Sequence, residues 1–217
     1  MNEETCPHGE IGDGSCPKCS VKNVRTPVRT PVEPIYVGLD MSLSSTGFCR
    51  LQSATITVET VKTTPRTKEN DLARLRFIVD EMMKKIPIGT HMVCIEDYFT
   101  PANRGQIGSA LKLVALGTLM RMALYEKGLP FYVIAPAQLK KFATGKGTGQ
   151  KSIVVREVYK KWGLDCADDN QADACVLAHM ARGLCVDKTT LLQYQQDVIV
   201  KVAKERPHYN CDEKVEG

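Results

Sequence analysis

The sequence has no long, uninterrupted apolar run. Its longest apolar segment, residues 110–125, contains Lys112 and Arg121, so we expect no membrane span. The first ten residues, MNEETCPHGE, are polar and lack the apolar stretch of a secretion signal, so we expect no export. Nine cysteines is an odd number, and six of them are scattered rather than spaced as a disulfide framework: Cys49, Cys94, Cys166, Cys175, Cys185 and Cys211. The sequence therefore predicts a cytoplasmic protein with reduced thiols.

Charge is unevenly distributed along the chain. The 217 residues, 43% apolar and 25% charged, are typical of one soluble domain plus a small appendage, and the net charge of +4 is modest. Between Gln138 and Lys161, however, seven basic residues stand against one acid, Glu157, which predicts a surface that faces phosphates. The alternative is an ordinary solvated helix face. The basic residues are Lys140, Lys141, Lys146, Lys151, Arg156, Lys160 and Lys161.

The amino-terminal residues 1–19 carry a candidate metal site. Cys6, His8, Cys16 and Cys19 lie within fourteen residues, with glycines between the two halves, and this ligand set suits tetrahedral zinc. The alternative is a tail with free thiols. Residues 20–34, SVKNVRTPVRTPVEP, repeat Arg-Thr-Pro-Val without an apolar period, which is typical of an extended linker. We therefore expect a tethered, zinc-knuckle-like segment that would draw its stability from one structural Zn²⁺.

An α/β domain is predicted over residues 35–186, followed by a helix and tail over residues 187–217. Apolar periodicity and turn residues indicate strands at about 35–41, 44–51, 54–62, 91–97 and 130–135, with the first three forming an antiparallel meander. They indicate helices at about 69–85, 107–127, 136–143, 150–162, 168–182 and 190–206. The order βββαβαβα is the ribonuclease H arrangement, a mixed five-stranded sheet flanked by helices. In that arrangement the first and fourth strands are neighbours.

Acidic residues occur at the ends of two predicted buried strands and on one face of a predicted helix. Asp40 ends the strand-like run IYVGLD and Glu96 ends HMVCIE, although a carboxylate loses free energy on burial unless a cation accompanies it. In the predicted helix 168–182, residues 169, 170 and 173 share one face. Asp173 lies too deep in the helix to cap it, and its upstream partner is either Asp169 or Asn170. A charged ligand binds magnesium better than an amide, which favours Asp169, although Asp169 could instead cap the helix.

Carboxylates gathered in this way are typical of a metal-dependent phosphodiesterase. Oxygen-only ligands favour Mg²⁺, with Mn²⁺ as a substitute. A pair of such ions about 4 Å apart can activate a water on one side of a phosphodiester and stabilise the leaving oxygen on the other. The sequence therefore predicts a nuclease site at Asp40, Glu96, Asp169 or Asn170, and Asp173.

Several motifs, in the right order, resemble the RuvC family of Holliday-junction resolvases from Ile35 to about Gly183. They are GLDMSLSSTGF (38–48), EDYF (96–99) with Asn103, SALKL (109–113), PAQLK (136–140) with TGKGTGQK (144–151), and ADACVLA (172–178). The resemblance implies a homodimer that binds four-way DNA junctions and makes paired, magnesium-dependent nicks leaving a 5′-phosphate. It also implies that Phe99 is a wedge at the junction centre and that Lys140, Lys146 and Lys151 contact phosphates.

The chain departs from the family pattern at two places. Asn170 stands where the family usually has an acid or a histidine, and the amino-terminal segment is not part of the usual pattern. A zinc-bearing protein that binds branched DNA through an impaired nuclease site is therefore one alternative. Another is a P-loop nucleotide-binding protein, because residues 145–152 differ from the Walker pattern at one position, where Gln150 replaces the second glycine. These residues are, however, expected to follow a helix instead of a strand. For Phe99, the alternative is packing in a core.

Overall fold

The domain is built on a mixed five-stranded sheet. The computed structural model describes residues 33–63, 71–97, 107–148, 150–205 and 207–208. The strands are β1 (Ile35–Asp40), β2 (Ser45–Gln52), β3 (Thr55–Lys62), β4 (Thr90–Glu96) and β5 (Phe131–Ile134). Their order in the sheet is β3-β2-β1-β4-β5, with β1, β2 and β3 antiparallel and β4 and β5 parallel to β1. The predicted strands, the antiparallel meander and the pairing of the first strand with the fourth are all confirmed.

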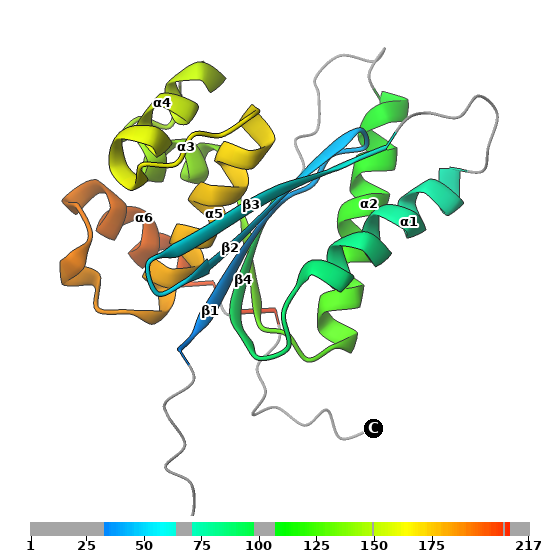
Figure 1. Ribbon diagram of the computed structural model, residues 1–217, viewed down its shortest axis with the longest axis horizontal. Helices are drawn as coiled ribbons and strands as arrows, with labels where there is room; N and C mark the ends of the chain where they lie inside the picture. The colour runs from blue at the N-terminus through cyan, green and yellow to red at the C-terminus, as the bar shows by residue number, and fades with distance from the viewer. Residues whose placement is uncertain (1–32, 64–70, 98–106, 149, 206, 209–217) are drawn as a thin grey trace, which may run out of the picture. The chain divides into compact units, whose positions relative to one another are not determined.

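Helices cover both faces of this sheet (Figure 1). One face carries α1 (Asp71–Lys85) and α2 (Ile107–Glu126). The other carries α3 (Pro136–Thr144), α4 (Lys151–Trp162), α5 (Asp169–Cys185) and α6 (Gln193–Val202). Successive strand residues point to opposite faces, so β1 sends Val37 and Leu39 toward α1 and α2 and sends Tyr36 toward α5. The two faces thus bury two separate apolar clusters.

The α1–α2 layer shows the helical spacing expected from the sequence. Helix α1 buries Leu75, Ile78, Val79 and Met82, which are three or four residues apart, and Asp71 and Lys85 complement its dipole at the two ends. Helix α2 is apolar on most sides and buries Leu116, Met120 and Leu124. Among the residues that the structure describes, no helix is both long and apolar enough to cross a membrane.

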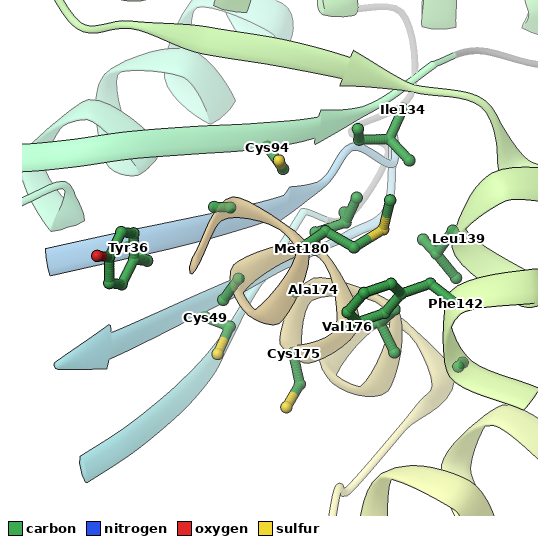
Figure 2. Close-up of a cluster of buried hydrophobic side chains, with 14 of the residues drawn as sticks. Tyr36, Cys49, Cys94, Ile134, Leu139, Phe142, Ala174, Cys175, Val176 and Met180 are labelled. Atoms are coloured by element: carbon green, nitrogen blue, oxygen red, sulfur yellow. The ribbon is translucent and has the colours of Figure 1, made fainter. Parts of the chain in front are cut away.

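Helix α5 lies directly on the sheet because small residues face each other across the contact. A Cβ atom added to Gly38 in β1 would lie 2.0 Å from the Ala174 carbonyl oxygen, and one added to Gly47 in β2 would lie 2.1 Å from that of Asn170. On the helix side the nearest atoms belong to Asn170, Ala174, Leu177 and Ala178. Figure 2 shows Ala174, Cys175, Val176 and Met180 of α5 among side chains from the sheet and from α3. Only glycine allows this close approach.

The amino-terminal end of α5 is tied to the edge strand β3. The Asp168 side chain caps the helix by accepting a hydrogen bond from the Gln171 backbone N–H at 2.8 Å. The Thr60 hydroxyl in β3 donates to the Asp168 carboxylate at 3.3 Å and accepts from the Gln171 side-chain amide at 3.0 Å. This network fixes the first turn of α5 over β2 and β3.

The far end of α5 is held to α4 by aromatic stacking. The rings of Trp162 and His179 are 3.8 Å apart and nearly parallel. Burial, together with the nearby Arg182 charge, lowers the pKa of His179 to about 3, so the imidazole is neutral at physiological pH. The helix that carries the predicted acids is therefore anchored in its first turn and again in its second half.

Helix α6 contributes to the same core as the rest of the domain. It buries Val198, Ile199 and Val202 in the α5-side cluster. Its Gln195 amide donates to the Phe142 carbonyl at 3.2 Å, and Lys161 of α4 donates to the neighbouring Ala143 carbonyl. Both carbonyls belong to the last turn of α3, where the helix itself provides no donors. This C-terminal helix thus braces the segment that joins α3 and α4, rather than forming an appendage.

Some sequence predictions concern residues outside the described ranges. They are the predicted zinc-binding segment with Cys6, His8, Cys16 and Cys19, the predicted linker up to residue 32, and the predicted wedge Phe99. Five cysteines lie inside the described ranges, and all five are free thiols: Cys49, Cys94, Cys166, Cys175 and Cys185. The near-Walker segment joins helix α3 to helix α4, so it lacks the preceding strand that a P-loop requires.

Candidate active site

Two of the predicted acids lie side by side at one edge of the sheet. In the parallel pairing of β1 with β4, Gly38 is opposite Cys94 and Leu39 is opposite Ile95. Asp40 and Glu96 are the next residues on each strand, and both are the last residues of their strands. Alternation along the strands directs both side chains to the face covered by α5. The register of the sheet therefore brings together two residues that are 56 positions apart in the sequence.

These carboxylates line a pocket of about 450 Å³ that is shared with helix α5. Asp173 and Asn170 line the same pocket from α5. The three elements predicted to supply acids, β1, β4 and α5, therefore meet there. Pro136, Lys140 and Val154 line it from the α3–α4 side, and Leu113 and Gly117 from α2. The remaining lining residues are Met41, Ser42 and Asp97.

The structure also places the residues around Asp173 in the first turns of α5. Asn170 lines the pocket, whereas Asp169, although described, is not among the lining residues. Asp168 serves as the helix cap and is engaged by Thr60. Gly47 lets the Asn170 backbone rest on β2 directly beside Asp40, because Gly47 is the residue paired with Asp40. Of the two candidate partners of Asp173, Asn170 is therefore the one that lines the pocket with it.

The donor set suits a hard divalent cation. Asp40 is only 6% exposed, and a carboxylate buried to this degree needs compensating charge or hydrogen bonds. Asp40, Glu96, Asp173 and Asn170 offer oxygen ligands only, which is the chemistry that magnesium and manganese prefer. No three acidic, histidine or cysteine side chains form a ready-made metal cluster among the described residues. Like charges repel, so bound cations would be needed to draw these carboxylates together.

The pocket also holds residues that the sequence did not single out. Ser42 lies in the β1–β2 turn, where its carbonyl accepts from the Thr46 hydroxyl at 2.7 Å, and this turn shapes one wall. Asp97 follows Glu96 and is paired with Arg121 at 2.8 Å. Polar residues just after a strand are common in loops. The sequence alone therefore gave no signal that Ser42 and Asp97 line the pocket.

The predicted DNA-contacting lysines are distributed around the α3–α4 segment. Lys140 lines the same pocket as the acids. Lys146 is exposed in the turn after α3, and the Thr144 hydroxyl bridges its backbone N–H and carbonyl at 3.1 and 3.0 Å. Lys151 begins α4. Of these three lysines, Lys140 is the one that lines the pocket.

Sheet order and site together define a ribonuclease H-like α/β domain with an acid-lined pocket at the carboxyl ends of two neighbouring parallel strands. The family model for "Crossover junction endodeoxyribonuclease RuvC" matches residues 36–200, which is most of the chain. The chain therefore belongs to the RuvC family, as the sequence motifs predicted. The matched range extends into α6, consistent with the packing of that helix in the domain core.

Individual relatives agree with this assignment. Crossover junction endodeoxyribonuclease RuvC of Anaeromyxobacter sp. (strain Fw109-5) is 31% identical over 121 residues, which cover 54% of this chain and 57% of the relative. The match thus spans little more than half of that relative's length. Two solved structures share the fold: Thermus thermophilus RuvC (TM-score 0.54) and the T. thermophilus RuvC complex with Holliday junction substrate (TM-score 0.53). Each is 18% identical, and each alignment covers 80% of this chain and 99% of the other.

Proposed function

We propose that this chain is a structure-selective endonuclease that resolves Holliday junctions or related branched DNA by paired phosphodiester hydrolysis. The observation that carries the proposal is that Asp40, Glu96, Asn170 and Asp173, from three different elements, line one pocket with Lys140 beside them. Membership of the RuvC family and the junction complex of a structural neighbour support the choice of substrate.

Each residue of the pocket has a distinct role in this proposal. Asp40, Glu96 and Asp173 would hold magnesium, or manganese in its place, with Asn170 adding a neutral oxygen and Asp169 lying nearby on α5. When bound, the ions would supply an activated water and charge stabilisation for the leaving oxygen. Lys140 would orient the scissile phosphate, while Lys146 and Lys151 would contact phosphates farther along the strand. Phe99 stays a predicted wedge and residues 1–19 a predicted zinc segment.

A cleavage panel tests the proposal. With Mg²⁺ or Mn²⁺, a synthetic four-way junction should be nicked at least about a hundredfold faster than the corresponding duplex, because only the branched substrate presents strands that are already bent and partly unstacked. With Ca²⁺, whose coordination is looser, binding should persist without nicking. Gel shifts and denaturing gels measure the two steps. Equal cutting of duplex and junction, or absence of cutting with Mg²⁺ and Mn²⁺, would contradict the proposal.

We also propose that two copies of the chain associate through the outer face of α2. Leu111, Leu119 and Met122 of α2 are 64%, 41% and 51% exposed, whereas Leu116 and Met120 of the same helix are buried. Exposed apolar side chains along one helix face are typical of an interface. A homodimer, which the family resemblance implies, would place two pockets on one junction and so account for paired nicks.

Met122→Glu should weaken this association at least about a hundredfold, because it buries an unpaired charge at the contact. Sedimentation velocity across a dilution series should then show monomers where the wild type sediments as dimers. Ile88→Glu is the matched control, since Ile88 is a fully exposed apolar residue in the turn before β4. An unchanged dimer in the Met122→Glu variant, or a monomeric wild type, would rule out this interface.

A further inference from the structure

Asp97 lines the acidic pocket, yet its carboxylate is engaged by a cation from another element. It directly follows Glu96, and alternation along the strand turns the two side chains toward opposite faces of the sheet. The Asp97 backbone N–H donates to the Ile134 carbonyl of β5 at 2.8 Å, which extends the β4–β5 pairing by one residue. Arg121 of α2 donates from Nη2 to the Asp97 carboxylate at 2.8 Å. Backbone and side chain of Asp97 are thus both held.

Arg121 reaches this position because of its register on α2. It lies one turn after Gly117 and two turns after Leu113, and both of those residues line the pocket. The Arg121 side chain is 21% exposed and that of Asp97 is 41% exposed. A partly buried pair is screened less by solvent than a surface pair. The ion pair therefore holds the Asp97 side chain at the wall of the pocket.

The ion pair between Asp97 and Arg121 affects which of the pocket's carboxylates are available to bind a cation. Four carboxylates line the pocket: Asp40, Glu96, Asp97 and Asp173. An additional carboxylate beside a cation site attracts ions and competes with the intended ligands. A guanidinium neutralises a carboxylate while its planar donors fix the geometry, which an ammonium group does less well.

We propose that Arg121 is a positioning residue that withholds Asp97 from the cation site, so that ions bind among Asp40, Glu96 and Asp173. This inference rests on the proposed function, because it concerns the cations of that same pocket. Without the guanidinium, the Asp97 carboxylate at the pocket lining loses the positive charge that neutralises it, and it then attracts an ion to an unproductive position. Cation binding then becomes tighter while cleavage becomes slower.

The first test compares the wild type with Arg121→Met in two assays. Mn²⁺ binding to the DNA-free protein, measured by titration calorimetry, should tighten about three- to tenfold, because a positive charge beside the pocket is lost. Single-turnover cleavage of a four-way junction in Mg²⁺ should slow by about ten- to a hundredfold, since the ions are displaced from the reacting phosphate. Junction affinity measured in Ca²⁺ should stay within about threefold of wild type.

Removal of the competing carboxylate should reverse the defect. The double variant Asp97→Asn with Arg121→Met should cleave at least about fivefold faster than Arg121→Met alone, because it lacks the competing Asp97 carboxylate. Arg121→Lys should keep at least about a third of wild-type activity, since it retains the charge. Arg76→Met is the matched control: Arg76 pairs with Asp80 at 2.8 Å, but on the exposed face of α1, so its loss should change neither assay.

Each outcome separates this inference from the proposed function. A merely structural role for the pair predicts that the double variant, which also lacks it, is as slow as Arg121→Met, and that result would overturn the inference. So would an Arg121→Met variant with wild-type Mn²⁺ binding and cleavage. If the wild type neither binds Mn²⁺ nor cuts junctions, the proposed function fails instead. Denaturation midpoints for all variants identify losses that are due to unfolding.

Discussion

Glu96→Gln is expected to slow junction cleavage by roughly a thousandfold or more while leaving junction binding intact or tighter. Glu96 ends β4 beside Asp40 and lines the pocket with Asp173, so the substitution removes one of three anionic ligands for the cations. The loss of a negative charge also reduces repulsion of the phosphates, which explains the tighter binding. Single-turnover cleavage in Mg²⁺ and gel-shift affinity in Ca²⁺ measure the two effects separately.

A matched control is available at the end of α2. Glu126 is exposed and absent from the pocket lining, so Glu126→Gln makes the same chemical change without touching the site. It should cleave at the wild-type rate. If Glu96→Gln also cleaved at the wild-type rate in Mg²⁺, Glu96 would not be a cation ligand. If Asp40→Asn left cleavage unchanged as well, the acids would serve binding alone, as in the alternative of an impaired nuclease site.

The fold was predictable because its local signals agree with one another. The short apolar runs of β1 to β3, the spacing of Leu75, Ile78 and Met82, and the turn residues between elements each specify an element. The order of these elements matches a single sheet topology. The side-by-side placement of Asp40 and Glu96 follows from that topology. Helix ends were less predictable: α5 extends to Cys185, beyond the predicted Arg182.

Details of the site were harder to predict because they depend on three-dimensional contacts. From the sequence, charge favoured Asp169 over Asn170, but the pocket lining includes Asn170 and not Asp169. The difference arises from how α5 is rotated about its axis, which depends on Asp168, Gln171 and Thr60. Thr60 lies more than a hundred residues upstream on β3. No local pattern in the sequence of the helix carries that information.

The ion pair between Asp97 and Arg121 illustrates the same limit. In the sequence, Arg121 is an interruption of an apolar helix, and Asp97 is one more acid after Glu96. Their 2.8 Å contact arises because α2 and the end of β4 converge at the pocket. A polar residue within an apolar helix is therefore informative only once the fold shows what it faces.

Gly38→Ala is expected to destabilise the domain by about 3 kcal/mol or more, which corresponds to a fall in Tm of roughly 6–12 °C. The new Cβ would lie 2.0 Å from the Ala174 carbonyl oxygen and 2.4 Å from the Ala178 backbone nitrogen. Both atoms belong to the backbone of α5, so no side-chain rotation can relieve the clash. The helix has to move away from β1, and it carries Asp173 with it. Chemical denaturation and thermal melting measure the loss.

Gly47→Ala should have a smaller effect on stability but a larger effect on the activity of the folded protein. Its Cβ would lie 2.1 Å from the Asn170 carbonyl oxygen, in the first turn of α5, so the displacement is greatest where the pocket is lined. Cleavage by the folded fraction should fall by about a hundredfold, because catalysis is sensitive to shifts of about 1 Å. Gly108→Ala is the control: nothing lies within 4 Å of its added Cβ, and alanine favours helix α2. Gly108→Ala should match or exceed wild-type stability and cleave normally. Wild-type stability and activity in both the Gly38→Ala and the Gly47→Ala variants would mean that α5 does not depend on these two glycines for its position over the sheet.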